Sequence, residues 1–289
     1  RPTFCHAGWL IAGGEPNADR IVEIAAAFEW LQASALVHDD LMDESDTRRG
    51  RPSVHREHEY WHEEHQLLGD SAQHGARVAI LLGDLLLSWA DEAFHQAGPD
   101  ARTAHLWARC KNEVISGQYL DVLAQTQARL TVEAALKVVR FKTAKYTIER
   151  PLHVGASLAG ADEDLLRALS DVAIPLGEAF QLRDDLLGVY GDPEETGKPA
   201  GDDLREGKRT VLLAHATALG DPELIYSILG TEEGALRLGA LFKEWGAVAA
   251  VEDDISRLAA QTETAIESLG ERGQNVLAPL VAMTIHRNR

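Results

Sequence analysis

The stretch that decides the fold is residues 38–50, which read His-Asp-Asp-Leu-Met-Asp-Glu-Ser-Asp-Thr-Arg-Arg-Gly. Asp39 and Asp43 stand four residues apart, so on a helix they project from one face, while Asp40 lies about 100° round. Carboxylates crowded in this way repel one another, and Mg²⁺ relieves the repulsion by taking a few carboxylate oxygens together with water and phosphate oxygens. The pair Arg48–Arg49 adds forked donors for phosphate. The stretch therefore predicts a helix that ends in a diphosphate site.

A second acidic cluster follows about 145 residues further along the chain. Gln181, Asp184 and Asp185 share a helix face, and two lysines flanked by glycine, Lys198 and Lys208, come after them. A solvated acidic helix end with a basic flank explains a single cluster. Two clusters, each with its own basic residues, instead predict a diphosphate held between two metal-binding helices and covered by a basic loop.

These residues resemble the motifs of the trans-isoprenyl diphosphate synthase (polyprenyl synthetase) family, and the resemblance covers nearly the whole chain. Three motifs fall in order: Asp39-Asp40-x-x-Asp43 with Arg48-Arg49-Gly50, Lys142-Thr143-Ala144, and Phe180-Gln181-x-x-Asp184-Asp185. Lys198 and Lys208 match the two lysines that follow in the family. The resemblance implies head-to-tail condensation of isopentenyl diphosphate with an allylic diphosphate (dimethylallyl, geranyl or farnesyl diphosphate).

The resemblance also implies the roles of individual residues. Mg²⁺, about three ions per active site with Mn²⁺ as a substitute, is held by the aspartates Asp39, Asp40, Asp43, Asp184 and Asp185. The substrates are bound by Arg1, Gln32, Arg48, Arg49, Lys142, Thr143, Gln181, Lys198 and Lys208. Those that act in catalysis are Asp39, Asp43, Arg48, Lys142, Thr143, Gln181, Asp184 and Lys198. Arg49 belongs to the isopentenyl diphosphate side.

The chemistry explains why such residues are needed. Breaking the allylic C–O bond leaves a carbocation and an increasingly negative diphosphate, so cations aimed at the leaving oxygens lower the barrier. Thr143 and Gln181 are neutral and suited to place oxygen dipoles near the cation. The π-bond of isopentenyl diphosphate then attacks, and the resemblance implies that the departed diphosphate takes the proton.

Three positions depart from the family pattern. The chain opens Arg1-Pro2 where the family has Gly-Gly-Lys-x-x-Arg-Pro, so we expect a further lysine and at least one helix before Arg1. Gln32 stands where a histidine is frequent, and it donates a hydrogen bond without charge. Gly188 stands where the second motif commonly ends in aspartate.

Length and composition predict one all-α domain over residues 1–289, an isoprenoid synthase helical bundle around a central cavity. No linker or repeat divides the chain. Ile24, Phe28, Leu31 and Ala35 have helical spacing, and glycine followed by a capping residue, as at Gly69-Asp70, marks helix boundaries. A homodimer is implied by resemblance only.

Charge and cysteine usage predict the protein's environment. The net charge of −18 argues against nucleic acid, and no apolar run is long enough to span a bilayer. The two cysteines, Cys5 and Cys110, lack metal-ligand spacing. We therefore expect reduced thiols in a soluble, cytoplasmic protein.

Product length is predicted from the helix that ends in the first cluster, because the growing chain should run antiparallel to it. Short-chain enzymes of the family carry an aromatic residue four or five places before the first aspartate, whereas Ala35 and Ser34 are small. The next large side chains are Leu31 and Trp30, the latter about 13 Å below Asp39. This depth favours geranylgeranyl diphosphate (C20), with C15 and C25 or longer products as alternatives.

Two other functions share parts of this pattern. A class I terpene cyclase would carry an Asn/Asp-x-x-Ser/Thr-x-x-x-Glu motif on the second helix, which Asp184-Asp185-Leu186-Leu187-Gly188 does not match. A noncatalytic subunit of a heteromeric synthase would usually lose its aspartates, and this chain keeps five of the expected six.

Overall fold

The computed structural model describes residues 1–127, 129–192 and 201–285. It divides into two compact units, one of Asn17–Pro99 with Pro2, the other of Arg1, Thr3–Pro16 and Asp100–Arg289. Within the described ranges, the only strands form one two-residue hairpin. The predicted all-α fold class is confirmed.

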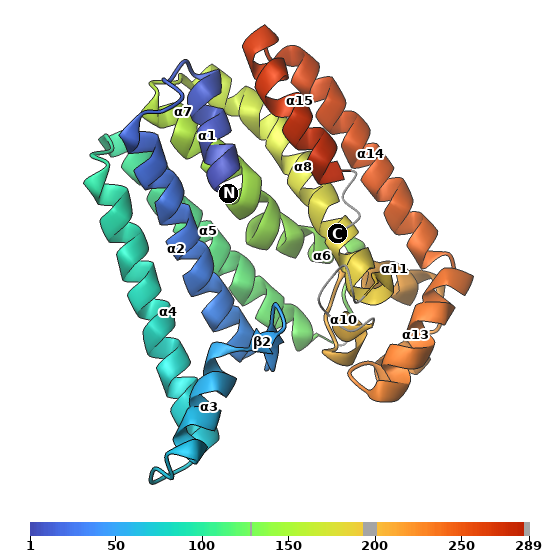
Figure 1. Ribbon diagram of the computed structural model, residues 1–289. Helices are drawn as coiled ribbons and strands as arrows, with labels where there is room; N and C mark the ends of the chain where they lie inside the picture. The colour runs from blue at the N-terminus through green and yellow to red at the C-terminus, as the bar shows by residue number, and fades with distance from the viewer. Residues whose placement is uncertain (128, 193–200, 286–289) are drawn as a thin grey trace. The chain divides into compact units, whose positions relative to one another are not determined.

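The smaller unit is built on two long helices. Its elements are α2 (Asp19–Met42), β1 (Thr47–Arg48), β2 (Arg51–Pro52), α3 (Val54–Glu64) and α4 (Ser71–Gln96). Figure 1 shows α2 and α4 side by side. Ile24, Phe28 and Leu31 are buried, as their spacing predicts, while Ala35 is half-buried. The helices approach closely at Gly83, where an added Cβ would lie 2.1 Å from Nε2 of His38.

The larger unit contains the remaining helices. They are α1 (Pro2–Ile11), α5 (Ala101–Gln125), α6 (Val132–Val139), the π-helix η1 (Arg140–Glu149), α7 (Arg150–Leu158), α8 (Glu163–Tyr190), α10 (Asp202–Arg205), α11 (Val211–Leu219), α12 (Pro222–Ile228), α13 (Glu232–Glu244), α14 (Ala247–Ser268) and α15 (Glu271–Ile285). Several begin at the capping residues that sequence predicts: the Asp162 and Asp221 side chains accept from the backbone N–H of Leu165 and Leu224.

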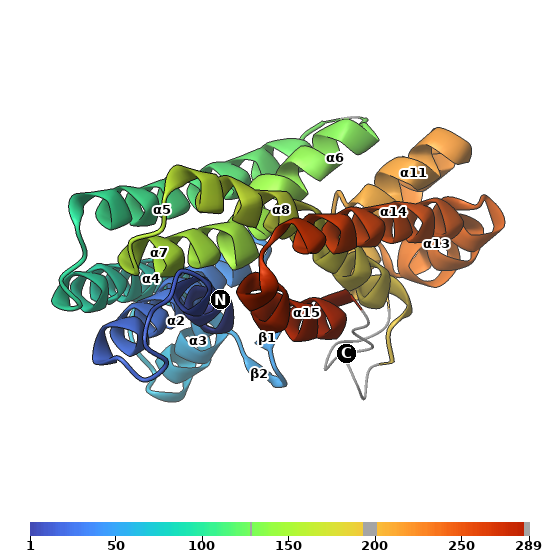
Figure 2. The ribbon, with the colours of Figure 1, turned by 90° about the horizontal axis from the view of Figure 1, so that it is seen from above.

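The core of the larger unit lies around α8, with α14 running along it (Figure 2). Leu182 and Leu186 of α8 pack there with Leu212, Phe242 and Val251. No helix in the described part of the chain is long and apolar enough to cross a membrane.

Two glycines fix the π-helix η1 between α5 and α8. A Cβ added to Gly117 would lie 2.4 Å from the backbone nitrogen of Lys142, and one added to Gly177 would lie 2.5 Å from Cα of Ala144. Real Cβ contacts are never this short, so both positions admit only glycine at the present helix spacing. The backbone of residues 142–144 is therefore held closely on two sides.

Candidate active site

The first acidic cluster stands at the end of α2. Asp39 and Asp43 lie one turn apart, both half-buried, and the N–H of Asp43 donates to the carbonyl of Asp39 at 2.8 Å. Asp40 points elsewhere: it is buried, and its Oδ1 accepts from Nε of Arg48 at 2.9 Å and also from Nη2 of the same side chain. Asp39 and Asp43 are therefore less deeply buried than Asp40, which is hydrogen-bonded by Arg48.

The arginine pair occupies a tight hairpin. Arg48 pairs with Arg51, and the two residues between them, Arg49 and Gly50, have φ angles of 53° and 73°. Positive φ at both central residues is the pattern of a type I′ turn, which matches the twist of a hairpin. A side chain is uncommon in this conformation. The turn separates the two guanidinium groups, because Arg48 is half-buried against Asp40 while Arg49 is exposed.

The second acidic cluster is joined to the Lys-Thr pair by a chain of hydrogen bonds. Oγ1 of Thr143, on η1, donates to Oε1 of Gln181 at 2.8 Å, and Nε2 of Gln181 donates to Oδ1 of Asp185 at 2.8 Å. Lys142 donates to Oδ2 of Asp121, on α5, at 2.6 Å. π-helical turns occur frequently at functional sites. Here the π-helix brings Lys142 and Thr143 to α5 and α8 respectively.

Asp184 and Asp185 differ sharply in environment. Asp184 is exposed, whereas Asp185 is buried. Burial raises the pKa of Asp185 to about 8, opposed by the hydrogen bond from Gln181 and reinforced by the charges of Asp203 and Asp184. Asp184 is therefore the solvent-exposed member of the pair.

Asp203 occupies the place left open by Gly188. A Cβ added to Gly188 would lie 2.1 Å from Oδ2 of Asp203. Nζ of Lys208 lies 3.4 Å from the other oxygen of Asp203 and 2.9 Å from Oε2 of Glu206. The carboxylate missing from α8 is thus replaced in space by one from α10, which also faces Lys208.

The donor set fits Mg²⁺ without forming a complete cage. Within the described ranges, no three His, Cys, Asp or Glu side chains gather into a group able to hold a metal ion. Asp39 and Asp43 are half-buried carboxylates at the end of α2 in the smaller unit, and Asp184 is an exposed carboxylate on α8 in the larger unit. Mg²⁺ commonly uses one or two carboxylates and completes its shell with water and substrate phosphate. The predicted ligands suit that mode of binding.

The other predicted substrate residues lie in several places. Arg1 stacks on the ring of Tyr146, 4.5 Å from its centroid, and donates to Oγ1 of Thr147 at 3.1 Å. Gln32 is half-buried on α2, about 20° from the Asp39 direction on an ideal helix. Lys198 lies outside the described residues.

Two of the four predicted chain-length residues face α4. Trp30 lies about 180° round α2 from Asp39, is 41% exposed, and meets the ring of Trp89 edge-on at 5.5 Å. Ser34 is buried and donates to the carbonyl of Gly83 at 2.7 Å. Leu31 is buried and lies closer than Trp30 to the face of α2 that carries Asp39. Ala35 lies closer to that face than Leu31 does. Nine residues place Trp30 on the face of an ideal helix opposite Asp39, so its role in the pocket floor stays a prediction for which Leu31 is better placed.

Sequence reasoning missed Asp121 and Asp203. Asp121 follows Gln118 by three residues on α5, and this polar pair on one helix face was the available signal. Asp203 stands in the acidic stretch before Lys208, but only the structure shows which side chain it approaches.

The described residues define an α-helical protein with two aspartate clusters, each accompanied by basic side chains. The sequence model of the polyprenyl synthetase family matches residues 1–238. This chain belongs to that family.

Named relatives span more than one product class. A geranylfarnesyl diphosphate synthase of Natronomonas pharaonis is 36% identical over 205 residues, which cover 69% of this chain and 55% of that protein. A geranylgeranyl diphosphate synthase of Saccharolobus solfataricus is 32% identical over 81% of this chain and 67% of its own length. The chain thus spans little more than half of the Natronomonas relative.

A solved structure is also similar over nearly the whole chain. It is a geranylgeranyl pyrophosphate synthase from Corynebacterium glutamicum, complexed with isoprenyl diphosphate and magnesium. It is 41% identical with a TM-score of 0.93, over 99% of this chain and 85% of that chain.

Proposed function

We propose that this protein is a Mg²⁺-dependent prenyltransferase that condenses isopentenyl diphosphate head to tail with allylic diphosphates. The observation that carries the proposal is the hydrogen-bonded set of Thr143, Gln181 and Asp185, next in sequence to the exposed Asp184. It places neutral oxygen dipoles next to metal-type carboxylates, in a chain of the polyprenyl synthetase family. The magnesium in the Corynebacterium structure supports the choice of metal.

Basic side chains and the metal held by the aspartates together neutralise the negative charge of the leaving diphosphate. Asp39, Asp43 and Asp184 hold Mg²⁺, which supplies positive charge to the leaving oxygens when bound. Arg48 and Lys142 bind the same diphosphate directly, and their partners Asp40 and Asp121 keep them in place before substrate arrives. Preorganised donors of this kind lower the barrier because they need little rearrangement during the reaction. Lys198 and Lys208 complete the set.

Thr143 and Gln181 stabilise the allylic cation. Because Gln181 donates to Asp185 and accepts from Thr143, its amide orientation is fixed. The hydroxyl oxygen of Thr143 keeps its lone pairs available after donating its hydrogen. Those lone pairs present negative charge density to the cation without offering a strong nucleophile.

Isopentenyl diphosphate binds on the side of Arg49, Arg1 and Gln32. The hairpin supports separate sites, since Arg48 is bound to Asp40 whereas Arg49, the next residue, is exposed. Arg49 is exposed and ready to receive a phosphate. Arg1 is already braced by Tyr146 and Thr147.

We place the product at C20, geranylgeranyl diphosphate. The Saccharolobus and Corynebacterium proteins carry that product in their names, while the Natronomonas relative is named for C25. Leu31 and, one turn deeper, Phe28 form the floor on the Asp39 side of α2, where both are buried. C15 and C25 or longer products are the alternatives.

We also propose that the protein works as a homodimer. On α4, Leu81, Leu85 and Trp89 recur every four residues and remain at least 41% exposed. On α5, Ile115 and Tyr119 are likewise exposed, by 59% and 67%. Apolar stripes of this kind on two long helices mark protein interfaces.

The test is to assay the purified protein alone. Isopentenyl diphosphate is supplied with dimethylallyl, geranyl or farnesyl diphosphate, with Mg²⁺, Mn²⁺ or EDTA, and products are separated by chromatography. We expect metal-dependent linear products up to C20. Asp39→Ala and Asp184→Ala should lower turnover by at least about a thousandfold. The matched control is Asp164→Ala, an exposed aspartate at the start of α8.

Other outcomes would identify a different function. A cyclic product formed without consumption of isopentenyl diphosphate would identify a terpene cyclase. No turnover by the folded protein alone would point to a noncatalytic subunit. Near wild-type turnover of folded Asp39→Ala and Asp184→Ala would refute the metal assignment.

A further inference from the structure

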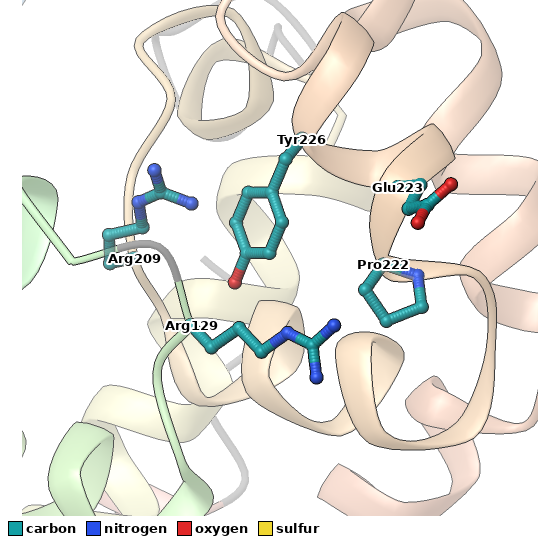
Figure 3. Close-up of a pocket in the computed structure, with 5 residues that line it drawn as sticks. All are labelled: Arg129, Arg209, Pro222, Glu223 and Tyr226. Carbon is teal, nitrogen blue, oxygen red and sulfur yellow. The ribbon is translucent and has the colours of Figure 1, made fainter.

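A pocket on the larger unit contains two arginines that the proposed reaction does not use. Its volume is about 300 Å³, and it is lined by Arg129, Arg209, Pro222, Glu223 and Tyr226. In Figure 3 the Arg209 guanidinium lies beside the ring of Tyr226, while the Arg129 side chain passes near the Tyr226 hydroxyl and extends towards Pro222. Arg209 precedes α11, and Arg129 lies between α5 and α6. The pocket brings together three regions that are distant in sequence.

Arg209 has hydrogen-bond donors that nothing satisfies. Its Nε and Nη1 atoms are buried, and among the described residues neither has a hydrogen-bond partner. Its guanidinium lies over the ring of Tyr226, 4.6 Å from the centroid, so a cation–π contact covers one face. Buried N–H groups in native proteins are nearly always paired with protein, water or an ion. The unpaired edge of Arg209 therefore points to a missing acceptor.

The rest of the lining matches an anion. Arg129 is exposed and forms no ion pair with any described residue. Oγ1 of Thr217 donates its own hydrogen to the carbonyl of Leu213 at 2.8 Å, so the hydroxyl of Tyr226 is the donor in the long 3.5 Å contact between them. Among the described residues this weak contact is the one hydrogen bond of the Tyr226 hydroxyl, which can turn to a better acceptor. Glu223 also lines the pocket, but its carboxylate points away from Tyr226 and pairs with neither arginine among the described residues.

Two uncompensated arginines are notable in a chain of net charge −18, where acidic partners are plentiful. Forked guanidinium donors match phosphate oxygens bidentately, and a tyrosine hydroxyl adds a further donor. We propose that this pocket is an accessory binding site for a phosphate-type oxyanion, bound by Arg209, with the exposed Arg129 side chain and the Tyr226 hydroxyl as further donors from the lining. The proposal does not depend on the proposed prenyltransferase activity.

The test follows the Arg209 Nε–H resonance by NMR in the full chain with ¹⁵N-labelled arginine. EDTA removes divalent metal, and inorganic phosphate and inorganic diphosphate are titrated separately. The resonance is assigned by its absence in Arg209→Gln. We expect a saturable shift in the wild type and an affinity at least about tenfold weaker in Arg129→Gln, which removes one charged partner. Tighter binding of diphosphate than phosphate would assign diphosphate as the ligand class, and equal affinity would assign a single phosphate group.

Arg257→Gln is the matched control, because Arg257 is an exposed arginine that pairs with Asp254 and does not line the pocket. It should leave the titration unchanged. Arg129 is exposed, so its replacement is expected to leave the fold intact. A resonance that does not move up to about 10 mM diphosphate, or one that moves with equal affinity in Arg129→Gln, would overturn the proposal.

Discussion

At position 188 on α8, glycine is required by the position of a neighbouring carboxylate. Oδ2 of Asp203 lies 2.1 Å from where a Cβ would begin, and Oδ1 of Asp203 faces Lys208. A side chain at 188 must displace Asp203 and, with it, a partner of Lys208. The two positions are therefore coupled.

The coupling between positions 188 and 203 predicts what happens when their residues are exchanged. Gly188→Asp and Asp203→Gly should each lower kcat/KM for the allylic substrate by about tenfold or more, because Lys208 loses its position. The double variant Gly188→Asp/Asp203→Gly should recover part of the loss, since one carboxylate again fills one space. Steady-state kinetics of the three variants measures this. Gly270→Asp, where the new side chain meets open space, is the control. Strictly additive losses in the double variant would contradict the coupling.

The sequence predicts the role of a single residue only where helical spacing determines the face on which its side chain lies. The four-residue interval between Asp39 and Asp43 predicted a shared face, and the structure places both there. Asp40 is predicted as a supporting metal ligand, and the structure adds a hydrogen bond from Arg48 that helical spacing does not predict. Arg48 lies eight residues further on, in the hairpin outside α2, so the spacing of residues on the helix does not reveal this contact.

At the scale of elements, helices were predictable and their irregularities were not. Apolar periodicity predicted a helix before Asp39, and α2 covers Asp19–Met42. The π-helix η1 (Arg140–Glu149) is not predicted from the sequence, because a short π-helical segment within a longer helical stretch changes the apolar spacing little. Its position depends on Gly117 and Gly177, which belong to other helices. The hairpin was missed too, since Arg49 adopts a conformation usually reserved for Gly, Asn or Asp.

The orientation of α2 predicts which residue limits product length. Leu31 lies about 12 Å before Asp39 and is buried, whereas Trp30 packs on Trp89 at the opposite face. Leu31→Ala should shift the product distribution towards longer chains by one or more isoprene units, because it removes the floor. Trp30→Ala, a larger truncation one residue away, should leave the distribution unchanged. Chromatography of the products measures both, and lengthening by Trp30→Ala alone would place the floor on the other face.

At the scale of the whole molecule, a buried polar network ties four helices of the larger unit together. Arg150 of α7 donates to Glu113 of α5 at 2.5 Å and 2.8 Å, and its Nη1 lies 2.9 Å from Nδ1 of His153. Nε2 of His153 lies 2.9 Å from the carbonyl of Leu166 on α8, and Glu149 of η1 pairs with Arg150 at 3.3 Å. Nδ1 must accept from a guanidinium, so this geometry requires a neutral imidazole.

The network predicts loss of stability in mild acid. Burial is the main cause that lowers the pKa of His153, to about 4, against 6.5 without burial. Below about pH 6.5 the unfolded chain therefore binds a proton that the native protein does not, and unfolding becomes easier down to about pH 4. Burial raises the pKa of Glu149, but Arg150, His153 and Lys145 outweigh it and lower the net value. Its stabilising contribution is present above its ordinary pKa of 4.5 and is lost as pH falls through the lowered value.

His153→Gln should remove the part of the pH dependence of stability that the buried imidazole causes. Glutamine keeps a donor for the Leu166 carbonyl and an acceptor for Arg150, but it does not titrate. Denaturant unfolding followed by circular dichroism at pH 7.5, 6.5, 5.8 and 5.0 should show the wild type losing up to about 1.4 kcal/mol per pH unit below 6.5 from this group. The variant should lose correspondingly less, although it starts from a lower stability at pH 7.5. His105→Gln, at an exposed histidine on α5, should keep the wild-type slope. Equal slopes in wild type and His153→Gln would show that the buried imidazole does not set the acid sensitivity of the fold.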